Sequence, residues 1–424
     1  MKEEKVNIQR LIRSEFSKIK TENDLLQLIN SIHKQLHNDY YAARGKQVPL
    51  IKLATLKYYK NYKTSLNKRY RTFTIKKKSG KDRIISAPAI GLKLIQQCLN
   101  EIFQTYYEAN NNACGFIPER NITYGAKLHI NRPYILNIDL KDFFDSITFP
   151  RIKKILMIPP FNLKNDKEPL AYIIACLCCH PKEVANINKN EDGDLIIKQV
   201  LPQGAPTSPI LTNIVCRNLD RHLLGLAKRF KANYSRYADD ITFSCKKNIF
   251  KSDSEFMIEL KRIIEDEQGL TINPEKTRVQ SKRQRQEVTG LVVNNKVNVS
   301  KRYIKQIRLW LHYWEKFGTE KAQQFFLGQY IRQRGNVKSH KSRIENVLGG
   351  KLDYMCMVVG SNNYTYKQLK QRYDKLLNDS TKNHIEGQNK HIDDDRNIKR
   401  HKMSQNITDD SLTSLLDELI VEMQ

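Results

Sequence analysis

The segment YSRYADDITFSC, at residues 234–245, is the most informative stretch of this sequence. Apolar and aromatic residues flank Asp239 and Asp240 on both sides, which predicts two strands joined by a tight turn. Two adjacent carboxylates at a turn repel each other, so this arrangement favours a bound cation. An isolated Asp-Asp turn is more often a solvated loop, and the other motifs of the chain must therefore decide its role.

A third acidic residue, Asp139, ends the apolar segment YILNID at residues 134–139, which predicts a buried strand. Phosphoryl transfer from a nucleoside triphosphate uses two divalent cations about 4 Å apart, which stabilise the attacking and leaving oxygens. Hard cations prefer carboxylate oxygens as ligands. If the strands that carry Asp139, Asp239 and Asp240 meet in one sheet, they form a two-metal site.

The net charge of the chain indicates a polyanionic partner. The 424 residues include 73 Lys and Arg against 45 Asp and Glu, a formal net charge of +28. Residues 379–424 hold 6 basic and 10 acidic side chains, so the rest of the chain carries +32. A surface this basic attracts nucleic acid through the release of counterions. A basic protein without such a partner is the competing interpretation.

The sequence predicts a cytoplasmic protein with no membrane partner. No run of about 18 apolar residues occurs, and the N-terminus MKEEKVNIQRLIR lacks the apolar stretch of a signal peptide. The 8 cysteines are therefore expected to be thiols. One cluster of possible zinc ligands consists of Cys176, Cys178, Cys179 and His180. However, these residues lie within or just after an apolar segment, and no second pair of ligands follows at the spacing of a zinc finger. We interpret them as core residues.

Residue periodicity predicts the order of secondary structure. Residues 1–60 have helical patterns, and residues 70–85 alternate as a hairpin that carries basic side chains. A helix with one apolar face is expected after Gly204. The segment TGLVVNNKVNVS, at residues 289–300, predicts another hairpin that turns at Asn294-Asn295.

The C-terminal residues differ in composition from the rest of the chain. Residues 379–407 are polar and predict a flexible linker. Leu412 to Met423 then recur at helical spacing behind Asp409-Asp410, which predicts an acidic amphipathic helix. Such a helix can dock on the basic part of this chain or on a partner protein, and the sequence leaves both open.

Four segments, in this order, together resemble the motifs of reverse transcriptases: FTIKKKSGKDRIISAP (73–88), NIDLKDFFDSI (137–147), LPQGAPTSPILTN (201–213) and YADD (237–240). The resemblance covers roughly residues 65–300. It implies an α+β right-hand polymerase that uses dNTPs and two Mg²⁺ ions, for which Mn²⁺ is a possible substitute. Fingers and palm are expected over residues 61–300 and a helical thumb over 301–378, after an N-terminal helical region at 1–60.

Two further elements resemble those of retron reverse transcriptases. One is Val288-Thr289-Gly290, and the other is an Asn-Ala-x-x-His element, which reads Gly125-Ala126-Lys127-Leu128-His129 in this chain. Gly125 replaces the Asn, so any task that the Asn performs in relatives must be performed by another residue in this chain. The resemblance implies an enzyme that copies a structured noncoding RNA, primes from a 2′-hydroxyl of that RNA and stays bound to the cDNA product. In many systems the complex restrains an effector protein in antiphage defence.

The resemblance also assigns roles near the acids. Asp139 and Asp239 would bind both cations, the Leu140 carbonyl would join them, and Asp240 would support the site. Phe144 would pack under the incoming sugar, where a bulky ring excludes a 2′-hydroxyl. Phe143 in that role, or simple core packing of Phe144, is the alternative.

Further roles fall outside the acids. Lys77 and Arg83 would clamp the triphosphate, because Arg offers a planar fork and Lys a point charge to phosphate oxygens. Gln203-Gly204 would approach the nascent base pair. His129 is either a positioning or RNA-contacting residue or an ordinary structural histidine. A last group mixes basic and aromatic side chains, which suits RNA contacts as well as thumb packing: Arg302, Lys305, Arg308, Trp310, Tyr313 and Trp314.

Two other functions remain open at this point. A group II intron maturase would also be a reverse transcriptase, but Val288-Thr289-Gly290 and the lack of an apparent endonuclease segment count against it. A ribonucleoprotein scaffold that holds an effector through Leu412–Met423 is the second, and it is compatible with polymerase activity. No RNase H segment is expected after residue 378. The sequence does not indicate an oligomeric state.

Overall fold

The computed structural model describes residues 2–76, 82–185, 195–334 and 342–379. At its centre is a five-stranded antiparallel sheet in the order β6–β7–β3–β8, in which β9 also pairs with β3. The bounds of these strands are β3 Tyr134–Lys141, β6 Asn233–Tyr237, β7 Asp240–Cys245, β8 Thr271–Ile272 and β9 Arg278–Ser281.

The central strand β3 is apolar because it separates two hydrophobic cores. Successive side chains of a strand point to opposite faces. Leu136, Ile138 and Leu140 enter a core built with the surrounding helices, whereas Ile135 enters a second core shared with the C-terminal helices. The strand predicted from YILNID is therefore confirmed, and Asp139 shares the face of Ile135.

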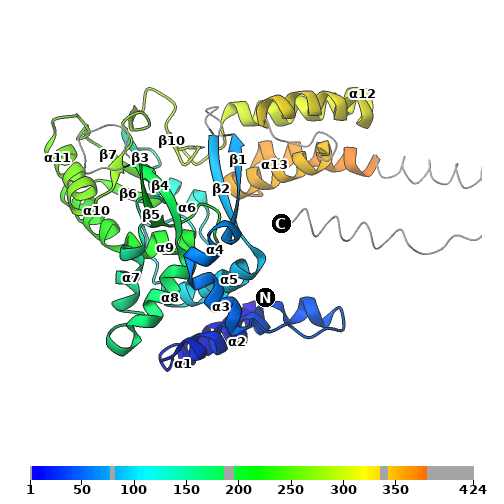
Figure 1. Cartoon of the computed structure of the whole chain (residues 1–424). Coiled ribbons are helices and arrows are strands. Elements are labelled where there is room, and N and C mark those ends of the chain that lie inside the picture. Colours follow the sequence, from blue (N-terminus) through cyan, green and yellow to red (C-terminus); the bar gives the residue numbers. More distant parts are fainter. Residues whose placement is uncertain (1, 77–81, 186–194, 335–341, 380–424) are drawn as a thin grey trace, which may run out of the picture.

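Helices cover the first core and support the sheet (Figure 1). The expected helical N-terminus is present, with a capping box between Thr21 and Asp24. The helix predicted after Gly204 is instead two helices that meet at Cys216. The bounds are α1 Lys2–Glu15, α2 Glu22–Ala42, α3 Leu53–Lys60, α4 Tyr62–Arg69, α5 Ile90–Tyr106, α6 Ile122–Lys127, α7 Phe149–Met157, α8 Glu168–Cys178, α9 Ser208–Val215, α10 Arg217–Arg229, α11 Glu255–Lys261, the 3₁₀ turn η1 Asn165–Lys167 and the π-helix η2 Arg262–Glu267.

The predicted hairpin at residues 70–85 is confirmed as β1 Tyr70–Lys76 and β2 Asp82–Pro88, which stand apart from the central sheet (Figure 1). A second hairpin, β4 His180–Ala185 with β5 Leu195–Val200, follows α8. The cysteines at the end of α8 are buried thiols, as expected of core residues.

The C-terminal part of the described chain is helical, as predicted. Helix α12 Lys301–Arg334, which is interrupted at Gly318, runs beside α13 Ile344–Val359, and a last helix covers residues 364–379 (Figure 1). Trp310 and Trp314 are buried in the second core. They therefore pack within this core, and their buried rings are not available for stacking on RNA bases.

The hairpin predicted at residues 289–300 differs in its turn. The regular pairing joins β10 Glu287–Val288 to β11 Leu291–Val292, so the chain reverses at Thr289-Gly290. Both residues have positive φ, 49° and 81°, as a two-residue hairpin turn requires. At the expected turn, Asn294-Asn295, the flanking segments are joined by a single antiparallel β-bridge, between Val292 and Asn298.

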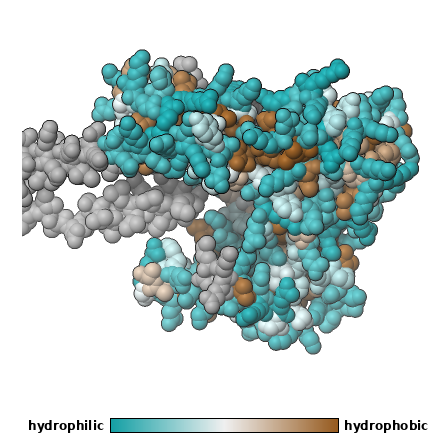
Figure 2. Space-filling view, turned by 180° about the vertical axis from the view of Figure 1, so that it is seen from behind, coloured by the Kyte–Doolittle hydropathy of each residue, from teal (hydrophilic) through white to brown (hydrophobic). Residues whose placement is uncertain are grey.

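Seen from behind, the molecule is mostly hydrophilic, with apolar side chains gathered in a band near the middle of the view (Figure 2). None of the helices in the described residues is both long and apolar enough to cross a membrane. The predicted linker and amphipathic helix, beyond residue 379, lie outside the described residues.

Candidate active site

The sheet brings the three predicted carboxylates together. Asp139 on β3 is the direct register partner of Asp240 on β7, and antiparallel partners point to the same face. Asp239 lies in the turn between β6 and β7, where its carbonyl accepts a hydrogen bond of 3.1 Å from the Leu140 amide. The turn contains Ala238 in the left-handed region, at φ 57°.

Burial and mutual repulsion raise the pKa values of Asp239 and Asp240. Burial raises the pKa of Asp240 to about 7, and the carboxylates of Asp239 and Asp139 add to this shift. Burial also raises the pKa of Asp239, with a contribution from Asp139, while the cations of Lys276 and Arg83 oppose it. The three acids are therefore close enough to disfavour one another's charge, so a cation among them would be stabilised.

Two residues that the sequence analysis did not single out hold Asp139. The Lys276 ammonium lies 2.8 and 3.0 Å from its two carboxylate oxygens, and the Asn273 amide donates a hydrogen bond of 3.3 Å. Both follow β8, which pairs with the end of β3 just beyond Asp139. This long-range pairing brings them to the site, and local sequence does not reveal it.

The donor chemistry of the site fits hard divalent cations, because three carboxylates converge on one sheet end. No set of three or more His, Cys, Asp or Glu side chains within the described ranges is arranged to hold a metal ion. In this structure the Lys276 ammonium contacts both carboxylate oxygens of Asp139.

A cavity of about 300 Å³ opens at the acids. Asp139 and Asp240 line it together with Lys276, Thr289 and Gly290. The Val288-Thr289-Gly290 element thus lies beside the carboxylates, because its turn reverses at this point.

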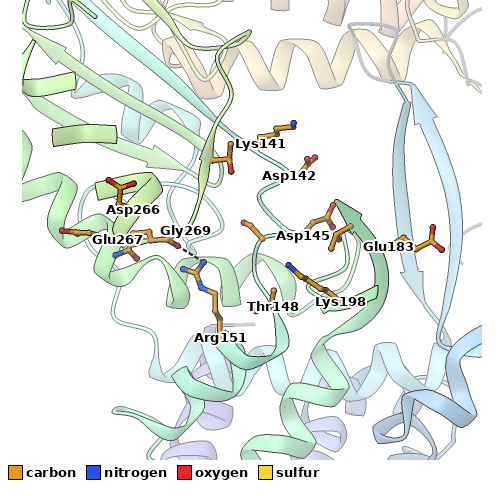
Figure 3. Close-up of a pocket in the computed structure, with 14 residues that line it drawn as sticks. Lys141, Asp142, Asp145, Thr148, Arg151, Glu183, Lys198, Asp266, Glu267 and Gly269 are labelled. Atoms are coloured by element: carbon orange, nitrogen blue, oxygen red, sulfur yellow. Dashed lines mark hydrogen bonds between the residues drawn. The ribbon is translucent and has the colours of Figure 1, made fainter. Parts of the chain in front are cut away.

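A larger groove of about 910 Å³ lies beyond the end of β3 (Figure 3). It is surrounded by Lys141 at the end of β3, Asp142 just after that strand, Lys198 of the β4–β5 hairpin and Asp266 of η2. Asp139, Asp239 and Asp240 do not line it. Asp139 and Asp240, though not Asp239, line the smaller cavity, which therefore forms one side of the candidate active site.

Comparison with known proteins agrees with this geometry. Residues 75–329 match the family model for "Reverse transcriptase (RNA-dependent DNA polymerase)". Retron Ec86 reverse transcriptase of Escherichia coli is 32% identical over 250 residues, which cover 58% of this chain and 70% of that protein. The chain belongs to the retron-type reverse transcriptases.

Two relatives from Myxococcus xanthus match over a smaller share of their length. Retron Mx65 reverse transcriptase is 36% identical over 57% of this chain and 55% of that protein, and retron Mx162 reverse transcriptase is 32% identical over 57% and 52%. The chain thus spans about half the length of these two relatives. A structure of telomerase from Candida albicans in complex with telomeric RNA aligns over 72% of this chain and 63% of the telomerase chain, at 12% identity. Its TM-score of 0.39 is too low to bear on function.

In this reverse transcriptase the fingers hairpin directs Arg83 toward the acids. Arg83 is paired with Ile75, and Ile85, two residues further along β2, lies against Gly204. Residues two apart share a strand face. Arg83 is therefore exposed on the face toward Gly204, and its charge reaches Asp239. Lys77, its predicted companion, lies outside the described residues.

Gly204 permits a close approach of its backbone to the hairpin of β1 and β2. A Cβ at Gly204 would lie 2.7 Å from the Ser86 carbonyl, and the Gly204 φ is +122°. The Ser86 amide in turn donates a 2.7 Å hydrogen bond to the Gln203 carbonyl. The backbone at Gly204 thus packs against the fingers hairpin, and the Gln203 side chain remains partly exposed.

The structure distinguishes the two candidate rings for sugar selection. Phe143 is buried at 2% exposure in the first core, whereas Phe144 is partly exposed and packs on the rim of that core. The two rings meet edge to face, with centroids 5.8 Å apart. Of the two rings, Phe144 is therefore the more accessible.

Direct RNA contact by His129 is wrong for this structure. The side chain is completely buried, and its ring nitrogens lie 2.8 Å from the hydroxyls of Ser244 and Ser235 on β7 and β6. Burial lowers its pKa to about 3, with a smaller contribution from Arg132. His129 thus supports the two strands that carry the acidic turn.

The substitution of Gly125 for the family's Asn has a packing reason. A Cβ at this position would lie 3.1 Å from the Cys114 sulfur and 3.4 Å from the Ser235 hydroxyl. A larger side chain at this position would therefore press on Cys114, which would have to shift by a few tenths of an ångström.

The predicted thumb cations are accessible. Arg302, Lys305 and Arg308 are exposed on α12, as a contact with RNA phosphates requires. Tyr313 instead stacks on Phe325 with ring centroids 3.6 Å apart, so its ring is partly occupied by the thumb itself.

Proposed function

We propose that this chain is an RNA-directed DNA polymerase that copies a structured noncoding RNA into DNA, as in retron msDNA synthesis. The observation that carries the proposal is the register pairing of Asp139 with Asp240 beside Asp239, in a chain of the retron family. Three carboxylates at one sheet end, facing an exposed arginine on the fingers, suit nucleotidyl transfer from a dNTP.

Each part of the site has a proposed task. Asp139 and Asp239 hold the cations with the Leu140 carbonyl, and Asp240 supports them. Arg83, with Lys77, binds the triphosphate through charge-assisted hydrogen bonds. Phe144 packs under the sugar and excludes a 2′-hydroxyl, while Gln203 lies against the nascent base pair.

The proposed cofactor is a pair of Mg²⁺ ions, which Mn²⁺ can replace. When bound, they lower the pKa of the priming hydroxyl and stabilise the leaving pyrophosphate. Asp139 exchanges its contact with Lys276, which orients the carboxylate beforehand, for this ligation. Arg83 supplies further positive charge where the triphosphate develops negative charge.

The proposed macromolecular partners are the RNA template and its cDNA. The net charge of +28 supports them, as do the exposed Arg302, Lys305 and Arg308 of the thumb, and each phosphate contact releases counterions. We assign fingers and palm to residues 61–300 and the thumb to 301–378. A role in antiphage defence, with an effector protein held by residues 379–424, completes the proposal.

Primer extension on an RNA template with purified protein tests the proposed chemistry. DNA synthesis should require Mg²⁺ or Mn²⁺ and dNTPs, and Asp139→Asn or Asp239→Asn should abolish it while RNA affinity stays within about twofold. Asp142→Asn, in the neighbouring groove, is the matched control and should remain active. Full synthesis by Asp239→Asn would refute the site.

A further inference from the structure

A buried polar network lies directly behind the acidic turn. Asp220 on α10 and Arg236 on β6 form an ion pair in which both side chains are almost completely buried, at 1% and 0% exposure. The guanidinium donates 2.7 Å hydrogen bonds from Nε and Nη2 to the two carboxylate oxygens. The Tyr234 hydroxyl donates a third, also of 2.7 Å, to Asp220.

The remaining donors of Arg236 reach beyond its partner. Nη1 donates a 3.1 Å hydrogen bond to the carbonyl of Ala238 in the acidic turn, and Nη2 a 3.2 Å bond to the side-chain oxygen of Asn213 on α9. Asn213 is fixed in turn by a 2.8 Å bond from its amide to the Gly115 carbonyl. One guanidinium therefore links α10, α9 and the turn that carries Asp239.

Ala238 needs such support. Its φ of 57° is in the left-handed region, which is unfavourable for a residue with a Cβ. From the other side the turn is confined by Gly115, where a Cβ would lie 3.0 Å from the Ala238 amide. The turn thus holds an unfavourable conformation between a hydrogen-bond donor and a closely packed backbone.

Stability alone does not explain the network. Removing two charges from water often costs more free energy than their attraction in a buried ion pair returns. Apolar residues of similar volume can therefore often replace such a pair without loss of stability. The bonds to Ala238 and Asn213 are what an apolar replacement would lose. This points to a function in orienting the turn.

We infer that Arg236, held by Asp220, is a positioning residue that fixes the Ala238 backbone and thereby aims the Asp239 carboxylate at the metal site. The inference rests on the proposed catalytic role of Asp239. Residues that orient metal ligands typically change metal affinity or activity by about 10- to 100-fold when they are replaced.

The test is an apolar replacement of the whole network: Tyr234→Phe, Asp220→Leu and Arg236→Met in one protein. It should fold and bind RNA normally, because no buried charge is left unpaired, but it should melt somewhat below the wild-type temperature, because the buried oxygens of Asn213 and Ala238 lose a donor. Mn²⁺ affinity, read from the electron paramagnetic resonance signal of free Mn²⁺, should fall about tenfold or more, and the rate of DNA synthesis about 100-fold. The matched control is Tyr234→Phe alone, which loses no bond to the turn and should keep both values.

A second variant covers the possibility that the triple variant does not fold. Arg236→Lys keeps the charge opposite Asp220, but one ammonium cannot reach Asp220, Asn213 and the Ala238 carbonyl together. It should show the same loss of Mn²⁺ affinity at a near-normal melting temperature. Wild-type Mn²⁺ binding and synthesis in either folded variant would overturn the inference. If Asp239→Asn itself stays active, the proposed catalytic site fails instead.

Discussion

The replacement His129→Gln tests whether this histidine serves the palm as a buried support. In the folded protein burial lowers the pKa of His129 to about 3, against about 6.5 in an unfolded chain. The unfolded state therefore binds more protons between these values, so the contribution of His129 to stability is complete above about pH 6.5 and is lost as the pH falls. At pH 5 the loss relative to neutral pH is about 2 kcal/mol.

Urea unfolding followed by circular dichroism at pH 7.5 and pH 5.0 measures this contribution. The wild-type protein should lose about 2 kcal/mol more unfolding free energy between the two pH values than His129→Gln does. The other histidines with a lowered pKa, His33, His37 and His180, titrate in both proteins and cancel. His312→Gln, at an exposed position of α12, is the matched control. Equal pH dependence in wild type and His129→Gln would refute the buried, neutral assignment.

Three further substitutions test individual parts of the account. Gly125→Asn should lower the unfolding free energy by about 1–3 kcal/mol through overpacking against Cys114, and Cys114→Ala should recover part of the loss in urea titrations; no loss would contradict the packing reason. Phe144→Ala should raise ribonucleotide incorporation about tenfold relative to deoxynucleotides in single-turnover extension, and unchanged selectivity would exclude this ring. Arg83→Ala should raise the KM for dNTP about tenfold, whereas Arg71→Ala, further from the acids on the same hairpin face, should not; equal effects would place the triphosphate elsewhere.

The acids could be predicted from the sequence because their motifs combine local features. An apolar strand that ends in Asp139 and a strand–turn–strand around Asp239 and Asp240 are visible in short segments. The register that makes Asp139 the partner of Asp240 follows from the pairing of those strands. The same holds for the fingers hairpin, whose alternation is local.

Contacts between distant segments could not be predicted. Lys276 reaches Asp139 because β8 pairs with β3, and Gly204 meets Ser86 because the fingers hairpin folds onto the segment after β5. The sequence alone does not distinguish a His129 that contacts RNA from one that forms hydrogen bonds with two buried serine hydroxyls. The turn at Thr289-Gly290 was missed because Asn294-Asn295 is the stronger turn signal, although Gly290 adopts the positive φ.

Sequencing the nucleic acid bound to the protein would show directly whether this enzyme copies RNA into DNA. The gene would be expressed with its native flanking DNA, and nucleic acid that copurifies with the protein would be sequenced after RNase, DNase and debranching treatments. We expect a discrete DNA joined to RNA, which is absent from an Asp239→Asn preparation that still binds the RNA. RNA without any such DNA in the wild-type preparation would contradict this expectation.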